Sequence, residues 1–209
     1  MEKLKRNFYE RNTLIVAKEL LGKILIHSSQ DGETVGKIVE TEAYIGPNDK
    51  GSHAYNSLRT KRTEIQYGQG GFAYIYQIYG KNFCFNIVTQ KMNMPEVVLI
   101  RALEPLNGID LMIKRRKIAL KDIVNLANGP GKLCSAMGID KSLYGADLCG
   151  DKLYLLKSED EGFIICSTPR INIEYALESK KYPWRFLIKN NIFVSRPIIE
   201  KNEIGVPPL

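Results

Sequence analysis

Length, composition and charge narrow the classes of protein to which this chain can belong. Its 209 residues, 44% of them apolar, are enough for one folded unit with a sizeable buried core. The formal net charge of +7 suits a nucleic-acid-binding surface, although ordinary solubility charge explains it equally well. The four cysteines lack zinc-ligand spacing, and no apolar stretch approaches the ~18 residues of a membrane span. We therefore expect a cytoplasmic protein that needs neither metal nor disulfide to fold and has no membrane partner.

The N-terminal part of the chain predicts a helix, two strands and a long loop. Asn12 is a candidate N-cap, and apolar residues follow it at helical spacing as far as Gly22. Residues 23–45 are expected to form two strands joined by a polar turn. Residues 47–71 lose this periodicity and predict a surface loop, whose length is typical of functional loops.

A hairpin and a buried strand come next. Residues 72–78 and 82–90 are rich in aromatic and β-branched side chains, and the YGKN between them supplies a short turn. The apolar run at residues 97–103 is interrupted by Arg101. This pattern predicts a strand that is buried on both faces and carries one charge near its end.

The second half of the chain alternates helical and strand patterns. We predict one helix over residues 109–127 and another from Pro130, at the first helical position, to a C-capping Gly138. One or two further helical turns are expected at residues 173–179, and short strands at residues 152–158, 162–173 and 184–190. Because no flexible linker divides the chain, we predict a single α+β domain over residues 1–209, built around an antiparallel sheet.

A possible general base lies in the second predicted strand. Side chains alternate along a strand, so Glu40, Glu42 and Tyr44 share one face. A carboxylate held near tyrosines and an arginine suits proton abstraction in a partly desolvated site. Either glutamate could serve, and either could simply face solvent. Arg101 could orient a reactant or form a buried ion pair.

Aromatic residues suggest a slot for a flat ring. Tyr44, Tyr76 and His53 could hold a nucleobase by stacking and by polar contacts to its edge, although each is also compatible with a structural role. Tyr79, at the predicted hairpin tip, has no evident core to enter and could act as a wedge between DNA bases. Asn86 interrupts an apolar strand, so its amide needs hydrogen-bond partners or could limit what enters the slot.

The order of these motifs resembles that of a known enzyme family. VETEAYIGPND, a loop histidine, YIYQIYGKNFCFNI, VLIRALEP, NGPGKLC, PRINI and PWRF follow one another between residues 11 and 195. The chain in this respect resembles the alkyladenine (methylpurine, or 3-methyladenine) DNA glycosylases of mixed α/β type. The resemblance implies a curved antiparallel sheet with a protruding hairpin. It also implies base excision repair of damaged purines in double-stranded DNA by a monomer without cofactor or metal.

Roles for single residues follow from the resemblance. It implies that Glu42 is the general base that activates a water for attack on the deoxyribose C1′. Arg101 would help to hold that water and the flipped nucleotide, and the carbonyl of Ile171 would be a further partner of the water. Tyr44 and Tyr76 would sandwich the flipped base.

The remaining matched positions concern the base edge and the duplex. His53 would contact the edge of the base, and Asn86 would disfavour guanine by crowding its exocyclic amine. Tyr79 would fill the gap left in the duplex, and Lys81, next to the hairpin glycine, would add an electrostatic contact to DNA. No lysine stands out as a Schiff-base nucleophile, so a monofunctional enzyme that leaves an abasic site is predicted.

Two other classes of function remain open from the sequence. A non-catalytic basic module that stacks nucleic-acid bases on exposed tyrosines would bind DNA and leave every lesion intact. An enzyme that acts on free purine nucleosides would not use the basic residues Arg59, Lys61 and Arg62 of the loop at residues 47–71, nor Tyr79 at the hairpin tip. The sequence is therefore less compatible with this class. The leading hypothesis is removal of 3-methyladenine, hypoxanthine or ethenoadenine from DNA by water.

Overall fold

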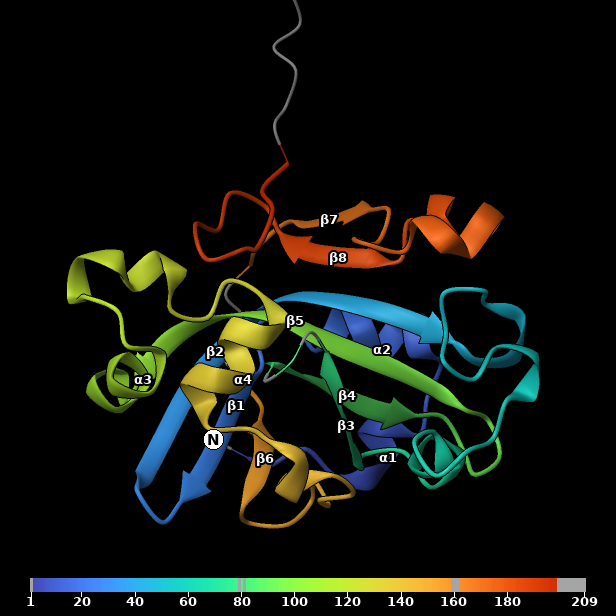
Figure 1. The fold of residues 1–209 in the computed structure, drawn as a ribbon, viewed down its shortest axis with the longest axis horizontal. Coiled ribbons are helices and arrows are strands. Elements are labelled where there is room, and N and C mark those ends of the chain that lie inside the picture. The colour runs from blue at the N-terminus through green and yellow to red at the C-terminus, as the bar shows by residue number, and fades with distance from the viewer. Residues whose placement is uncertain (1, 79, 81, 159–161, 199–209) are drawn as a thin grey trace, which may run out of the picture.

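The computed structural model describes residues 2–78, 80, 82–158 and 162–198, and in this part of the chain eight strands form one curled antiparallel sheet (Figure 1). Six of them follow the order β3-β4-β5-β2-β1-β6, while β8 pairs with both β2 and β7. The bounds are β1 Ile24–Ser29, β2 Gly32–Ile45, β3 Ala73–Ile78, β4 Asn82–Thr89, β5 Glu96–Asn107, β6 Leu153–Leu156, β7 Ile165–Thr168 and β8 Arg185–Ile188. The predicted α+β fold around an antiparallel sheet is confirmed.

The centre of the sheet is the long pair formed by β2 and β5. Its register is interrupted by a β-bulge, because Glu40 pairs with Ala102 whereas the next residue, Thr41, pairs with Ile100. Arg101 is therefore the extra residue of β5. A bulge bends the strand and redirects its side chains. This one turns the Arg101 guanidinium toward the glutamates of β2, which it contacts.

The α-helices are short, with bounds α1 Arg6–Tyr9, α2 Thr13–Glu19, α3 Ile109–Arg116 and α4 Pro130–Met137. The predicted start of α2 is confirmed, since Asn12 Oδ1 accepts hydrogen bonds from the backbone N–H groups of Leu14 at 3.0 Å and Ile15 at 3.3 Å. The predicted ends of α4 are also confirmed, with Pro130 in its first turn and Gly138 left-handed at φ 71°.

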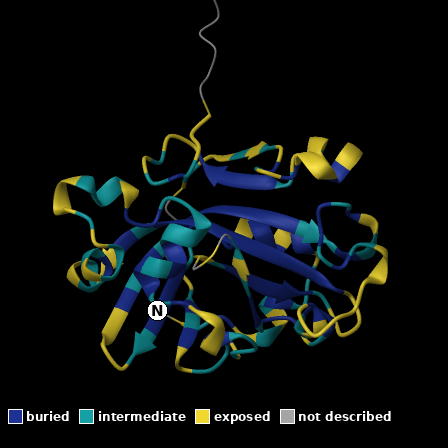
Figure 2. Ribbon diagram, in the orientation of Figure 1, coloured by how far each residue is buried: buried dark blue, intermediate teal, exposed yellow. Residues whose placement is uncertain are grey.

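The two faces of the central strands meet different environments. Apolar side chains such as Ile75, Phe85 and Ile100 join the main core, to which α2 and α4 also contribute. The alternating residues, among them Tyr74 and Val97, form a smaller cluster bordered by partly buried tyrosines. Figure 2 shows the central strands mostly buried, whereas β7 and much of the connecting loops are exposed or intermediate. This smaller cluster marks the second face of the sheet, which carries the residues of the candidate site.

The helix predicted over residues 109–127 is wrong beyond residue 116. Lys117 takes a left-handed conformation at φ 53° and ends α3, and a separate 3-10 turn, η4, follows at Leu120–Asn125. Three basic side chains occupy the last turn of α3, where they complement the negative end of the helix dipole. The charged run that seemed to belong inside one long helix thus stabilises the end of a short one.

Two segments that flank the site depart from regular structure. The loop predicted at residues 47–71 contains the 3-10 turns η2 Tyr55–Ser57 and η3 Glu64–Tyr67, with η1 Gly46–Asn48 at its start. The strand predicted over residues 162–173 is correct only for β7, because the chain leaves the sheet after Thr168. The expected helical turns near residue 173 form the 3-10 segment η6 Glu174–Lys181, and η5 spans Lys141–Leu143.

Three further observations concern the cysteines, possible metal binding and the length of the helices. All four cysteines are free thiols. In the described ranges no three His, Cys, Asp or Glu side chains lie close enough together to hold a metal ion. The helices of the same ranges are all too short or too polar to cross a membrane.

Candidate active site

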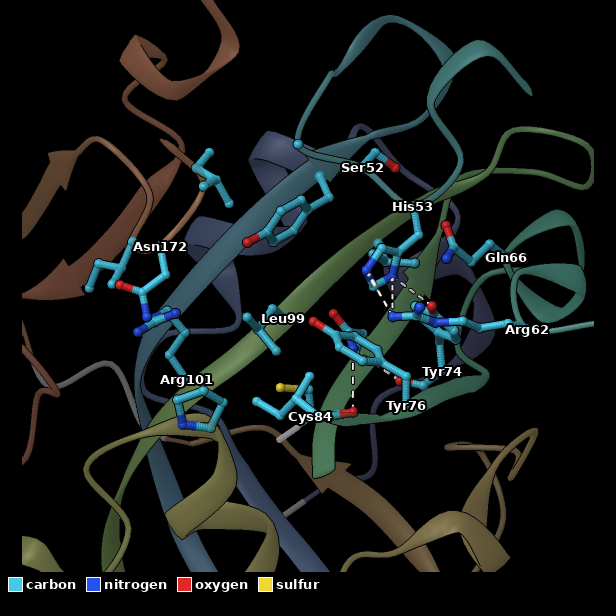
Figure 3. Close-up of a pocket in the computed structure, with 18 of the residues that line it drawn as sticks. Ser52, His53, Arg62, Gln66, Tyr74, Tyr76, Cys84, Leu99, Arg101 and Asn172 are labelled. Carbon is cyan, nitrogen blue, oxygen red and sulfur yellow. Dashed lines mark hydrogen bonds between the residues drawn. The ribbon is translucent and has the colours of Figure 1, made fainter. Parts of the chain in front are cut away.

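A cavity of ≈ 270 Å³ lies on the second face of the sheet, over β2 to β5 (Figure 3). This is near the lower limit of about 300 Å³ for small-molecule pockets, a size that suits a single ring system. Strand residues form its floor: Tyr44, Tyr74, Tyr76, Ile78, Cys84, Asn86, Val97, Leu99 and Arg101. Residues of loops, 3-10 turns and the start of α4 form its walls: Gly51, Ser52, His53, Arg62, Gln66, Pro130, Ile171, Asn172, Ile173 and Tyr175.

The register of the sheet explains why residues so distant in sequence meet here. Tyr74 pairs with Asn86, Asn86 with Leu99, Leu99 with Glu42, and Glu42 with Arg185. Directly paired residues in an antiparallel sheet point to the same face. One row across five strands therefore carries aromatic, amide, apolar, acidic and basic side chains, in that order.

Glu42 has no exposed surface and is held behind residues that line the cavity. Its Oε1 accepts a hydrogen bond from the backbone N–H of Ile171 at 2.8 Å, and its Oε2 accepts from the Tyr44 hydroxyl at 2.9 Å and Arg101 Nη1 at 3.2 Å. All three donors line the cavity.

Glu40, the other candidate base, is held in a different way. Its Oε1 accepts from Arg101 Nε at 2.9 Å, Arg185 Nε at 2.7 Å and Ser195 Oγ at 2.8 Å, and its Oε2 accepts from the Ser195 N–H at 2.6 Å. Burial would raise its pKa, but the two guanidinium groups keep it below its ordinary value. Neither glutamate is itself a lining residue, but all three donors to Glu42 line the cavity, whereas Arg101 alone among the donors to Glu40 does. The alternative left open by the sequence thus falls to Glu42, whose catalytic role stays a prediction.

Arg101 links the two carboxylates. Burial acts to lower its pKa, yet the charges of Glu42 and Glu40 raise the pKa above its ordinary value, so the guanidinium remains charged. It is also one of the lining residues and is labelled in Figure 3. One side chain thereby fixes the position of Glu42 and brings a positive charge to the cavity wall.

Aromatic rings form the middle of the cavity. His53 meets Tyr76 edge to face, with 4.6 Å between ring centroids, and Tyr74 meets Tyr76 at 5.4 Å. The far side of the Tyr44 ring packs against the Arg170 guanidinium at 4.6 Å. Burial raises the pKa of both Tyr44 and Tyr76. The two tyrosines expected to sandwich a base thus lie in one cavity as neutral rings.

His53 has both ring nitrogens engaged. Arg62 Nη2 donates to Nε2 at 2.9 Å, so Nδ1 carries the hydrogen and donates to the Tyr74 hydroxyl at 2.8 Å. Burial, together with the nearby Arg62 charge, lowers the pKa of His53 to about 4. The imidazole is neutral at physiological pH. Contact with a base edge remains a prediction, and it requires Arg62 or Tyr74 to release a nitrogen.

The other predicted residues fall into two groups. Asn86 lines the cavity and donates from Nδ2 to the Tyr74 carbonyl at 3.1 Å, which meets the need for a partner of this buried amide. Ile171 lines it too and donates its backbone N–H to Glu42, while the role of its carbonyl as a partner of the water stays a prediction. Tyr79 and Lys81 lie outside the described residues, so their DNA-binding roles stay predictions.

An ion pair that sequence reasoning missed supports the site from behind. Asp49 and Arg170 have fully buried side chains, joined at 2.5 Å and 2.7 Å. Arg170 also donates to the carbonyl of Ala43 at 2.9 Å, and its plane faces the Tyr44 ring. The pair ties the loop after β2 to the segment that delivers the Ile171 amide. Its signal in the sequence was weak, because neither residue belongs to a periodic element.

Comparison with known proteins agrees with this geometry. The family model described as Methylpurine-DNA glycosylase matches residues 7–192. A protein of Clostridium acetobutylicum is 52% identical over 199 residues, covering 92% of this chain and 97% of that protein. One of Desulfitobacterium hafniense is 47% identical over 201 residues, covering 93% and 99%. Both bear the name "Putative 3-methyladenine DNA glycosylase".

The fold, the cavity and these comparisons together define a DNA-repair enzyme, a DNA glycosylase that acts on alkylated purines. Within that class, the chain belongs to the methylpurine-DNA glycosylase family. The resemblance inferred from the motif order is thereby confirmed over nearly the whole chain.

Proposed function

We propose that this enzyme flips a damaged purine nucleotide out of double-stranded DNA and hydrolyses its N-glycosidic bond, with 3-methyladenine, hypoxanthine and ethenoadenine as its substrates. Glu42 takes a proton from a water molecule whose oxygen bonds to the deoxyribose C1′. The C1′–N bond breaks, and its electron pair leaves with the purine. The products are a free base and an abasic site, and no cofactor takes part.

The observation that carries this proposal is the position of Glu42. A buried carboxylate, oriented by hydrogen bonds from three residues that all line a ring-sized cavity, has the surroundings of a general base. When charge develops on the sugar in an oxocarbenium-like transition state, the same carboxylate stabilises it. Arg101 holds the carboxylate and supplies the positive charge that orients the water and the flipped nucleotide.

Recognition of the base falls to the aromatic residues. Tyr44 and Tyr76 hold the flipped base between them, His53 contacts its edge, and Asn86 disfavours guanine by crowding its exocyclic amine. The hairpin residues Tyr79 and Lys81 contact the duplex that the base has left. Flipping costs least for damaged or mispaired bases, which adds selectivity before the cavity is reached.

A monofunctional, monomeric enzyme inside the cell completes the proposal. A glycosylase that also cuts the strand needs an amine nucleophile at the sugar, and none of the described residues that line the cavity is a lysine. The basic surface, at a net charge of +7, supports binding to the DNA backbone. Binding should then weaken as salt rises, with a log–log slope of about −0.9 for each phosphate neutralised.

The test is single-turnover excision from a duplex oligonucleotide with one hypoxanthine, with abasic sites revealed by alkaline cleavage. We expect the wild type to cut and Glu42→Gln to bind the same duplex while cutting about 10²- to 10⁴-fold more slowly. Glu64→Gln, an exposed glutamate on the loop, is the matched control and should cut normally. A wild type that leaves hypoxanthine, ethenoadenine and 3-methyladenine intact contradicts the proposed activity, and an active Glu42→Gln contradicts the assignment of the base. Trapping of a borohydride-reduced adduct contradicts the monofunctional mechanism.

A further inference from the structure

Gln66, in η3, is a buried amide whose hydrogen-bonding capacity is not used by the described part of the protein. The residue is 1% exposed, and it lines the cavity beside His53 and Arg62 (Figure 3). Neither its Oε1 nor its Nε2 has a hydrogen-bond partner among the described residues. A buried amide in this condition destabilises the folded protein, because it has lost its hydrogen bonds to water without replacement.

Gln66 differs in its position from the other buried polar groups that lack partners. In the described ranges these are the hydroxyls of Tyr9 and Tyr67, Nε2 of His27 and Nε of Arg170. None of these four residues lines the cavity, whereas Gln66 does. An unsatisfied donor and an unsatisfied acceptor are thus brought together at the place where a ligand binds.

The neighbouring hydrogen bonds leave Gln66 free for a ligand. Arg62 donates to His53, and His53 donates to the Tyr74 hydroxyl, so these three residues form a chain with a fixed direction. Burial raises the pKa of Tyr74 to about 12, and Gln66 lies near enough to moderate that rise without forming a hydrogen bond of normal geometry. The chain ends at the Tyr74 hydroxyl, and Gln66 beside it retains a donor and an acceptor among the described residues.

We propose that Gln66 is a specificity-determining residue, whose carboxamide recognises a purine edge that presents a hydrogen-bond donor next to an acceptor. This inference rests on the proposed excision of flipped purines. A carboxamide can accept and donate at once, which is how Asn and Gln recognise adenine in DNA. Binding such a purine would supply both partners that the amide lacks in the free protein.

Known purine chemistry then divides the proposed substrates. Hypoxanthine presents N1–H beside O6, and 3-methyladenine presents its exocyclic amine beside a ring nitrogen, so each complements the carboxamide. In 1,N6-ethenoadenine the added ring consumes the N–H groups of that edge, and only acceptors remain. A site with buried polar groups rejects a ligand that cannot pair with them. Gln66 therefore favours hypoxanthine and 3-methyladenine over ethenoadenine.

The test compares Gln66→Met with the wild type on duplexes that contain either hypoxanthine or ethenoadenine, under single-turnover conditions. Methionine keeps the length of the side chain and removes the amide. We expect excision of hypoxanthine to fall about 10- to 100-fold relative to excision of ethenoadenine. The melting temperature should rise by about 2–4 °C, since an unsatisfied buried amide has been removed.

Two further variants make the result specific. Gln66→Leu removes the amide with a different apolar side chain and should reproduce the change in substrate ratio. Gln69→Met makes the same substitution at an exposed glutamine three residues later and should change neither the ratio nor the melting temperature.

The possible failures are distinguishable. A wild type that excises both lesions, together with Gln66 variants that keep its substrate ratio, overturns this inference and leaves the proposed function intact. A lower melting temperature in both Gln66 variants would mean that the amide is a structural partner, and this also overturns the inference. A wild type that excises neither lesion overturns this inference, and if it also leaves 3-methyladenine intact, it overturns the proposed function as well.

Discussion

The two ends of the cavity satisfy their polar groups in opposite ways. At the acidic end, Glu40 and Glu42 receive seven hydrogen bonds, most of them from charged donors or from backbone N–H groups. At the amide end, formed by Arg62, His53, Tyr74 and Gln66, the imidazole is neutral, and the Gln66 carboxamide has no hydrogen-bond partner within the part of the chain that the structure describes. One end is held rigidly, and the other keeps capacity for a ligand.

This difference fits the two tasks of a glycosylase. Proton abstraction needs a carboxylate whose position does not change, and charged hydrogen bonds are the strongest means to fix it. Recognition of a base needs donors and acceptors that a ligand can use, which excludes their full use by the protein. The buried amide of Gln66, which destabilises the folded protein because it is unpaired among the described residues, therefore lies at the end of the cavity that we propose to recognise the base.

The largest expected effect comes from breaking the acidic end at Glu40. Glu40→Gln would leave two buried guanidinium groups with one carboxylate fewer, and we expect the free energy of unfolding to fall by about 3–5 kcal/mol. Urea unfolding monitored by circular dichroism measures this. Glu64→Gln, which breaks the exposed pair with Arg59, should have little effect. Wild-type stability in Glu40→Gln would show that the charge of Glu40 does not hold the acidic end together.

A smaller loss in the free energy of unfolding is expected when the pH is lowered, because of the titration of His53 at the amide end. The pKa of His53 is about 4 in the folded protein, against an ordinary value of 6.5. Between these values the unfolded chain binds a proton that the folded protein does not, so the free energy of unfolding falls as the pH falls through this window. At about 1.4 kcal/mol for each pH unit, the loss reaches at most about 3 kcal/mol.

The measurement is urea unfolding of the wild type and His53→Asn from pH 7 to pH 4. His53→Asn should depend less steeply on pH. Burial also lowers the pKa of His27, so His27→Asn serves as the comparison, and it should remove a separate part of the slope. If His53→Asn keeps the full wild-type slope, His53 is not held neutral by the fold.

The smallest expected effect sharpens the description of the amide end. Arg62→Gln removes the positive charge that lies next to His53, so the pKa of His53 should rise, but by less than burial lowers it, since burial is the larger cause. The imidazole resonances of His53 in an NMR titration report this shift. Arg59→Gln, on the same loop but paired with Glu64, should leave the titration unchanged. An unchanged titration in Arg62→Gln would mean that burial alone sets this pKa.

The sequence predicted the acidic end better than the amide end. Glu42, Tyr44 and Arg101 lie in strands, where period-two alternation and an interrupted apolar run mark the residues of one face. The sequence could not decide between Glu40 and Glu42, because period-two alternation places both on one face of the strand. The structure separates them by their hydrogen-bond partners. The sequence also did not predict the bulge at Arg101, since the bulge arises from the pairing of β2 with β5, which are distant in the chain.

The amide end depends on a long loop without periodicity. His53 was found through a motif, but Gln66 and the Asp49–Arg170 pair carry no pattern that separates them from other polar loop residues. Their burial results from the way η3 and the segment after β7 fold over the sheet, which is a tertiary effect. The helix predicted over residues 109–127 failed for a related reason, since a cap at Lys117 overrode a periodic sequence.

The row that runs from Tyr74 to Arg185 also limits how this enzyme can change in length. Inserting or deleting a single residue within β2, β4 or β5 would shift the side chains that follow to the opposite face, and would separate the aromatic residues from the carboxylate. The turn between β1 and β2 lies outside the row and tolerates such changes. A scan of single-residue insertions should accordingly divide the chain into inactivating strands and permissive turns, whatever amino acid is inserted.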